Sequence, residues 1–175
     1  MSERDLVLGP GVDAAIRRHG EETYPHECCG ALVGRDGRAD AVVALPNTTE
    51  EGPRRRFLVR PSDYRLAEQR AGELGGELLG FYHSHPDHPA RPSQFDLDHA
   101  WPTFAYIIVA VEGVGLTRPS DDLSRRRAEG AKAEGAAAAA MTVWFLKDDR
   151  SSFEEGTLQH GDENTDSHSA AAVHR

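Results

Sequence analysis

The sequence predicts a single α/β domain. Apolar runs of strand length alternate along the chain with longer stretches that have the spacing of amphipathic helices, an order typical of α/β folds. The 175 residues include 38% hydrophobic residues, which is enough for one core in a domain of this length. No internal repeat is visible in the sequence.

In the first half of the chain, strands are expected at residues 6–8, 29–34, 41–45 and 56–60. Asp36 and Gly37 form a turn sequence that would join the second and third of these strands as a hairpin. Helices are expected at residues 11–22 and 62–74. The second helix would have Ser62 as its N-cap, with Leu66 and Ala67 on its apolar side.

In the second half, the apolar run at residues 78–82 predicts a buried strand that Pro86 would stop. A short helix would begin at Ser93, residues 105–111 would form a buried central strand, and residues 141–146 the last strand. Residues 119–140 are low in complexity and rich in alanine and arginine, which predicts a flexible insert or a frayed helix. The polar residues 156–175 predict a disordered tail, so the expected domain comprises residues 1–155.

Composition and charge exclude several classes of protein. The formal net charge is −9, and because phosphate binding needs a basic face, we expect no nucleic acid partner. The N-terminal residues lack the apolar core of a signal peptide, and the longest apolar stretch, residues 136–146, is too short to span a bilayer, so no membrane association is expected. The two cysteines are adjacent, which excludes a disulfide framework and favours a cytoplasmic location.

Residues 83–96 contain three metal ligands at a workable spacing. His83 and His85 follow the apolar run, and side chains two apart on a strand point to the same face, so both imidazoles can converge on one ion. Asp96 would return toward them on the short helix that begins at Ser93. Two histidines and one carboxylate leave a fourth position open for water, as catalytic zinc sites require. His88 would close that position, so it is not expected to bind the metal.

The pattern His-x-His, seven residues, then Ser-x-x-Asp resembles the signature of the MPN/JAMM zinc metalloprotease family, also called the JAB domain. His83, His85, Ser93 and Asp96 match it without a gap. The wider segment is most similar to the small bacterial branch, which includes peptidases that act on sulfur-carrier proteins. The resemblance implies Zn²⁺ as cofactor and a mixed, curved sheet flanked by helices, similar to the cytidine-deaminase-like core.

The resemblance also implies the chemistry of the site. The segment Tyr-Pro-His-Glu-Cys-Cys-Gly matches the place of the family's glutamate, which assigns the general acid/base role to Glu27. Zinc lowers the pKa of its bound water to about 7 and polarises the scissile carbonyl. Ser93 would donate a hydrogen bond to the oxyanion, although a role as helix cap alone remains an alternative. The implied reaction is hydrolysis of a peptide or isopeptide bond at the C-terminus of a ubiquitin-like or sulfur-carrier protein.

Other functions predict different residues. A thiol nucleophile at Cys28 served by His26 is the first alternative, whereas Cys29 alternates with apolar residues and predicts an inert buried thiol. A non-catalytic scaffold of the same fold would have lost a ligand or the glutamate, and this chain has kept them all. A zinc deaminase would require a Pro-Cys-x-x-Cys pattern, which does not occur. A metal-binding interaction, storage or sensor domain would tolerate the loss of Glu27.

Overall fold

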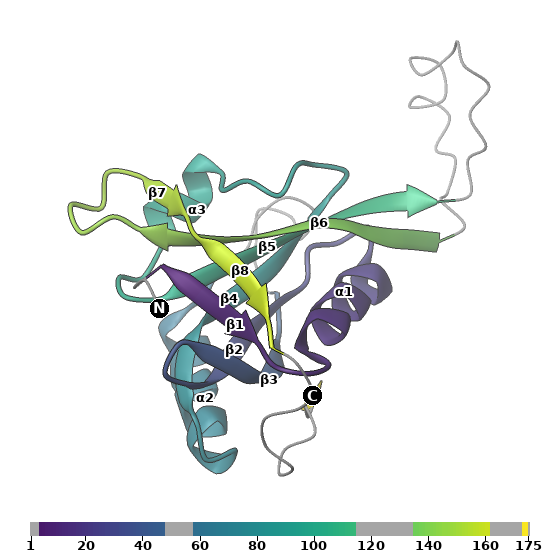
Figure 1. Ribbon diagram of the computed structural model, residues 1–175. Coiled ribbons are helices and arrows are strands. Elements are labelled where there is room, and N and C mark those ends of the chain that lie inside the picture. Colours follow the sequence, from purple (N-terminus) through teal and green to yellow (C-terminus); the bar gives the residue numbers. More distant parts are fainter. Residues whose placement is uncertain (1–3, 48–57, 115–134, 162–172, 175) are drawn as a thin grey trace.

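The protein forms one mixed β-sheet in the part of the chain that the computed structural model describes, residues 4–47, 58–114, 135–161 and 173–174 (Figure 1). The strand order is β7-β6-β5-β4-β2-β3-β1-β8, and β9 pairs with β3. The strands are β1 (Asp5–Leu8), β2 (Cys29–Arg35), β3 (Arg38–Leu45), β4 (Glu77–Pro86), β5 (Ala105–Val114), β6 (Gly135–Leu146), β7 (Phe153–Glu155), β8 (Thr157–His160) and β9 (Val173–His174).

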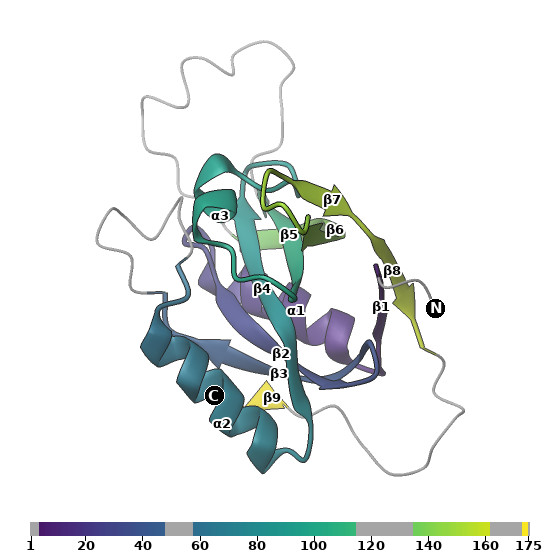
Figure 2. The same cartoon turned by 90° about the vertical axis from the view of Figure 1, so that its left-hand side faces the viewer.

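The two ends of this sheet are joined by consecutive strands. β7 pairs with β6, β8 pairs with β1, and Gly156 alone separates β7 from β8. The N–H of Gly156 donates to Val143, and the N–H of Thr157 donates to Arg4, so the chain passes from one end of the sheet to the other within two residues. A Cβ atom at position 156 would overlap the Arg4 carbonyl and the Phe145 ring. The sheet is therefore strongly curved and nearly closed (Figure 2).

Helices cover both faces of the sheet. α1 (Val12–Thr23) inserts Val12 and Ile16 into one core with Leu8, Tyr82 and Ile107. α2 (Pro61–Glu73) lies on the opposite face, where a second core contains Ala67, Ala71, Phe81 and Tyr106 (Figures 1 and 2). Since alternate side chains of a strand point to opposite faces, Phe81 and Tyr82 belong to different cores. The side chains of His83 and His85 consequently lie on the α2 side.

Strand β4 is at the centre of the sheet. It pairs with β2 in antiparallel register, with Cys29 opposite His83, and with β5 in parallel register, with Ile108 beside His83. Gly80 is tightly surrounded, because a Cβ atom there would overlap the carbonyl of Ala105. The chain then leaves β4 through a loop and returns as α3 (Gln94–His99), which brings a second segment over the end of β4.

The expected strand at residues 56–60 is wrong over residues 58–60, which have no regular structure; residues 56 and 57 lie outside the described part. Helix α2 begins at Pro61, and its N-cap is Arg60, not Ser62 as the sequence predicted. The reason is local. Proline is favoured at the first helical position, and Asp63 reaches back to accept a hydrogen bond from the N–H of Arg60.

Two other expectations are corrected where the structure describes them. The alanine run 136–140 was expected to be flexible or helical, but it is the first half of β6. Pairing with β5 supplies one edge, while Arg17 and Glu21 of α1 bond the backbone of Ala139 and Ala138 on this segment. Residues 157–160, expected to be disordered, form β8. Residues 119–134 and 162–172 lie outside the described residues.

No helix in the described ranges has both the length and the apolar character needed to cross a bilayer. The two cysteines are buried and free.

Candidate metal centre

His83 and His85 lie near the C-terminal end of β4. Their side chains leave the same face of the strand, and the exposed fraction of each residue is below 10%. Ser84, between them, points to the other face, where its hydroxyl accepts a hydrogen bond from the N–H of Cys28 at 2.8 Å. The N–H of Ser84 donates to the Cys28 carbonyl at 3.1 Å. The strand that holds the imidazoles is thus fixed to the segment just before β2.

Asp96 is oriented by the N-terminus of α3. Ser93 is the N-cap, as the sequence predicted, and Asp96 is the third helical residue of a capping box. The carboxylate oxygen Oδ2 accepts hydrogen bonds from the Ser93 N–H at 2.6 Å and from the Ser93 hydroxyl at 2.8 Å. These bonds hold the carboxylate in one orientation and direct Oδ1 toward His83.

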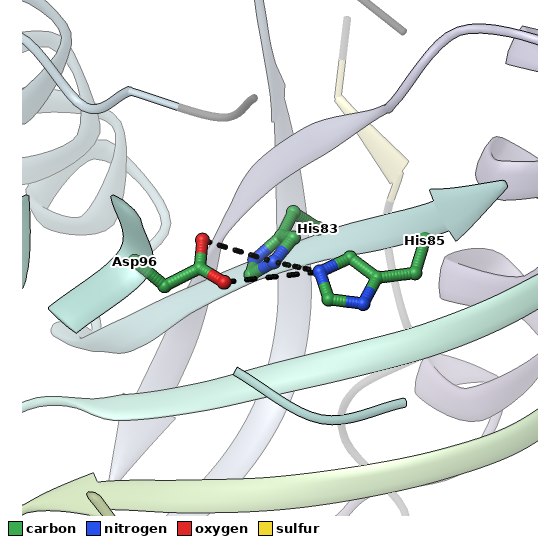
Figure 3. Close-up of side chains that lie close together, drawn as sticks. All are labelled: His83, His85 and Asp96. Carbon is green, nitrogen blue, oxygen red and sulfur yellow. Dashed lines mark hydrogen bonds and ion pairs between the residues drawn. The ribbon is translucent and has the colours of Figure 1, made fainter. Parts of the chain in front are cut away.

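The three side chains converge on one point (Figure 3). The two histidine Nε2 atoms are 3.1 Å apart, His83 Nε2 lies 3.4 Å from Asp96 Oδ1, and His85 Nε2 lies 3.8 Å from Asp96 Oδ2. Tetrahedral ligands with metal bonds of about 2.0–2.1 Å stand about 3.3–3.4 Å from one another. Donor types and spacing are therefore compatible with zinc, and this group is the one found among the described residues that could hold a metal ion.

Hydrogen bonding prepares His85 for such a role. Its Nδ1 lies 2.8 Å from the Pro89 carbonyl, which can only accept, so Nδ1 carries the proton and Nε2 presents its lone pair to the site. Burial alone would lower the pKa of His85, but the bonds to Asp96 and Pro89 outweigh it and raise the pKa. Burial lowers the pKa of His83, although Asp96 opposes it. Despite its burial, Asp96 has a pKa well below its usual range because the imidazoles favour its charged form.

Glu27 lies beside the group, on its β2 side. Cys29 is opposite His83 and Cys28 is bonded to Ser84, so continuing this register places Glu27 next to His85. Glu27 is only 4% exposed, and its Oε2 has no hydrogen-bond partner among the described residues. Burial raises the pKa of Glu27 to about 8; the charge of His85 lowers it and that of Asp96 raises it. A buried carboxyl with a raised pKa is suited to proton transfer near neutral pH.

The thiol alternative finds no support. His26 and His88 are exposed. Burial raises the pKa of Cys28 to about 11 and raises that of Cys29 further, so neither thiol is ionised at neutral pH. Cys29 donates its S–H to the Leu45 carbonyl at 3.3 Å. Both are structural groups.

A pocket opens beside His83 and Asp96. Its other walls are mainly apolar and include Trp101, Tyr106 and Phe153. The sequence did not predict this pocket, because Phe153 follows the others by some fifty residues and nothing in the pattern brings it to the site. The sequence also did not predict the hydrogen bonds between Ser84 and Cys28 or between His85 and the Pro89 carbonyl. They depend on how the backbone is placed in the fold.

Comparisons with known proteins extend this description. The chain is 33% identical to the desampylase of Haloferax volcanii over 120 residues, which are 65% of this chain and 86% of that protein. It is 34% identical to a probable TtuB-protein conjugate cleaving protease of Thermus thermophilus over 109 residues, 62% of this chain and 72% of that protein. It is also 35% identical over 82 residues, 47% of this chain, to the tail tip assembly protein K of Escherichia phage N15, but spans only 31% of that protein.

Among solved structures, a JAB1/MPN domain protein from Archaeoglobus fulgidus superposes with a TM-score of 0.51 over 90% of this chain and 98% of that chain, at 20% identity, which shows a shared fold. The family described as prokaryotic homologs of the JAB domain matches residues 10–142. The family and the α/β fold expected from the sequence are thereby confirmed. With most of its length covered by that match, the chain belongs to the prokaryotic homologs of the JAB domain.

Proposed function

We propose that the protein is a zinc-dependent metallopeptidase that hydrolyses a peptide or isopeptide bond at the C-terminus of a ubiquitin-like or sulfur-carrier protein. The observation that carries this proposal is a buried carboxyl, Glu27, next to the zinc-compatible group His83, His85 and Asp96. The desampylase and the conjugate cleaving protease support the choice of reaction, since the names of both describe removal of a protein conjugate.

His83, His85 and Asp96 would hold the zinc ion. When bound, zinc supplies a water of lowered pKa and polarises the scissile carbonyl. Glu27 takes a proton from the attacking water and then gives it to the leaving amine. Its Oε2 has no hydrogen-bond partner in the described part of the chain and is available for that transfer. The positive charge of the ion would lower the pKa of Glu27 from about 8 toward neutrality, where both proton steps are efficient.

Ser93 has two roles in this proposal: it caps helix α3, and it donates a hydrogen bond to the oxyanion. In the structure its hydroxyl donates to Asp96 Oδ2 and accepts from the Asp96 N–H. With the carboxylate bound to zinc, the hydroxyl would turn its proton toward the oxyanion while it continues to accept the backbone bond. Rotation about one side-chain torsion is enough, because the two bonds use different atoms of the hydroxyl.

The substrate class follows from the relatives' names and from the geometry of strand addition. A ubiquitin-like tail would enter as an extended segment, which is read through its backbone and through pockets for alternate side chains. Sulfur-carrier proteins are the narrower form of this proposal. Their C-terminal segment would enter the site in the same extended form.

The test combines metal content with cleavage. The purified protein is analysed for zinc per chain and incubated with a ubiquitin-like carrier protein joined through its C-terminus to a lysine-containing peptide. Wild type should bind one zinc and cleave the bond. Glu27→Gln should keep zinc and lose about 10²–10⁴-fold in kcat, whereas His85→Ala should lose zinc.

His88→Ala is the matched control, since it removes an exposed imidazole three residues from His85. It should leave both zinc content and cleavage unchanged. Full activity in Glu27→Gln, or no zinc in the wild type, would refute the mechanism. Bound zinc without cleavage of any conjugate would favour a non-catalytic scaffold or zinc-binding interaction domain instead.

A further inference from the structure

Most of the side chains that line the pocket beside His83, His85 and Asp96 are apolar, while His83, Asp96 and His99 add polar atoms to its wall. The Tyr106 hydroxyl accepts from the Trp101 N–H at 2.6 Å and donates to the Trp101 carbonyl at 3.1 Å. The indole N–H of Trp101 points to the Val59 carbonyl at 3.5 Å. Because the backbone engages the polar atoms of Trp101 and Tyr106, these two side chains offer mainly carbon to a ligand.

These walls are braced by other aromatic side chains. Trp101 stacks on Tyr64 with ring centroids 5.0 Å apart, and Tyr106 meets Phe153 edge to face at 5.6 Å. Tyr106 is 6% exposed and Ile108, at the base, 1%. Such contacts hold the rings in place before any ligand arrives, so the pocket is preformed and binding does not require the cost of ordering its walls.

The pocket and Glu27 lie on opposite sides of the metal group. Glu27 continues the β2 register and stands next to His85. The pocket instead follows the β5 side, where Ile108 is beside His83 and Tyr106 is beside Phe81, two residue pairs nearer the start of β4. His83 and Asp96 belong to both the metal group and the pocket wall. The pocket is therefore continuous with the reaction centre.

This arrangement orients a substrate. Glu27 gives its proton to the leaving amine, so the leaving segment lies on the Glu27 side. The acyl segment then extends across the metal group toward Trp101 and Phe153. In an extended segment, every second side chain points to the same wall, at a spacing of about 6.6 Å.

We propose that this pocket, through Trp101, Tyr106 and Phe153, is a specificity site that binds one apolar side chain of the carrier tail on the acyl side of the scissile bond. The inference rests on the proposed function and adds to it a rule for the tail sequence. A tail with a leucine-sized residue at the matching position is preferred, because its carbon atoms would be buried against Trp101, Tyr106 and Phe153.

The first experiment reads this preference directly. The conjugate used above carries leucine, alanine or aspartate at each of the last six tail positions in turn, and kcat/KM is measured. At one position, leucine should exceed alanine by about 10–100-fold. Trp101→Ala should reduce that ratio to near unity and raise KM more than it lowers kcat, while Trp101→Phe restores most of the ratio. A ratio of unity at every position, or one unchanged in Trp101→Ala, would overturn the proposal.

A second variant acts in the opposite direction. Ala100 lines the pocket and is 4% exposed, so Ala100→Leu should fill it. This variant should select alanine over leucine at the same tail position, a reversal that general loss of structure cannot produce. Dependence on the residue after the scissile bond instead of before it would place the pocket on the leaving side and refute the orientation.

Binding can be measured without catalysis. The chain has two tryptophans, Trp101 and Trp144, so Trp144→Phe leaves Trp101 as the only indole. In the double variant with Glu27→Gln, the leucine-bearing conjugate should shift the Trp101 emission to shorter wavelength, and the alanine-bearing one should not. Equal shifts contradict the specificity site. If the wild type cleaves nothing while this shift occurs, the proposed hydrolysis fails and the tail-binding pocket stands.

Discussion

Helices α2 and α3 begin with the same aspartate-to-cap hydrogen bond but use it differently. In both, an aspartate at the third helical position accepts a hydrogen bond from the N–H of the N-cap residue, Asp63 from Arg60 at 3.1 Å and Asp96 from Ser93 at 2.6 Å. Both carboxylates are largely buried. Asp63 is further paired with the guanidinium of Arg60 at 3.2 Å. Asp96 instead faces two imidazoles.

The difference lies in what each carboxylate meets besides the N–H of the cap residue. In α2 the cation comes from the cap itself, so the motif is complete within the helix end and serves stability. In α3 the cap uses mainly Oδ2, and the remaining oxygen is held in place for a partner from β4. In α3, a local capping motif therefore also holds a carboxylate in place at the candidate metal site. The following predictions test that distinction.

The largest effect is expected from the two aspartates themselves. Asp96→Asn keeps an oxygen for the capping bond but removes the anionic ligand, so zinc content should fall and kcat/KM should drop by roughly a thousandfold or more, since water activation is lost. Asp63→Asn should bind zinc and cleave as the wild type does, while losing about 1 kcal/mol of unfolding free energy. Equal zinc loss in the two variants would remove the functional difference between the two aspartates.

The N-cap residues allow a second, finer separation. Glycine replaces a serine cap at a cost of only a few tenths of a kcal/mol, so Ser93→Gly should keep its melting temperature almost unchanged. It lacks the hydroxyl donor, however, and kcat should fall about 10²–10³-fold. Arg60→Gly is the control at the other helix and should leave kcat unchanged. If Ser93→Gly retained full kcat, Ser93 would be a cap and nothing more.

The charged form of Glu27 is expected to lower the free energy of unfolding, whereas Asp63 is expected to raise it. Its pKa is raised by burial from 4.5 to about 8, so the folded state holds a proton that the unfolded chain releases. The metal-free protein should therefore be most stable relative to Glu27→Gln below pH 4.5 and lose that advantage as the pH rises through 8. At pH 8, Glu27→Gln should be the more stable by on the order of 3 kcal/mol in urea unfolding. A difference that does not change with pH would contradict the raised pKa.

The smallest effect is expected at Cys28. Its thiol is buried, and its raised pKa keeps it protonated, so Cys28→Ala should change kcat by less than about twofold. Thiol-alkylating reagents should not inactivate the zinc-loaded wild type. Strong inactivation that the alanine variant escapes would return the thiol mechanism to consideration.

The convergence of His83, His85 and Asp96 was predictable from the sequence because it depends on local geometry. His83 and His85 are on the same face through strand alternation, and Ser93 marks the start of the helix that carries Asp96. Glu27 was reached only through the family resemblance. Its burial beside His85 follows from the pairing of β2 with β4, and a partner 58 residues away cannot be inferred from neighbouring residues.

The errors in the fold have the same origin. Alanine has the highest helix propensity, yet residues 136–140 form a strand because β5 and the side chains of Arg17 and Glu21 satisfy their backbone. Tertiary pairing outweighed local preference. In the same way, the polar sequence 157–160 gave no strand signal, and only the free edge of β1 explains its order.

The turn at Gly156 limits how far the protein can be truncated at its C-terminus. A protein shortened to residue 155, the domain end suggested by composition, would lack β8 and leave one edge of β1 unpaired, because only β3 would remain beside it. An unpaired edge of this kind is a template for association between molecules. Expression of a shortened form should therefore keep residues 157–160, and a substitution at Gly156 should be avoided, because no side chain fits between Arg4 and Phe145.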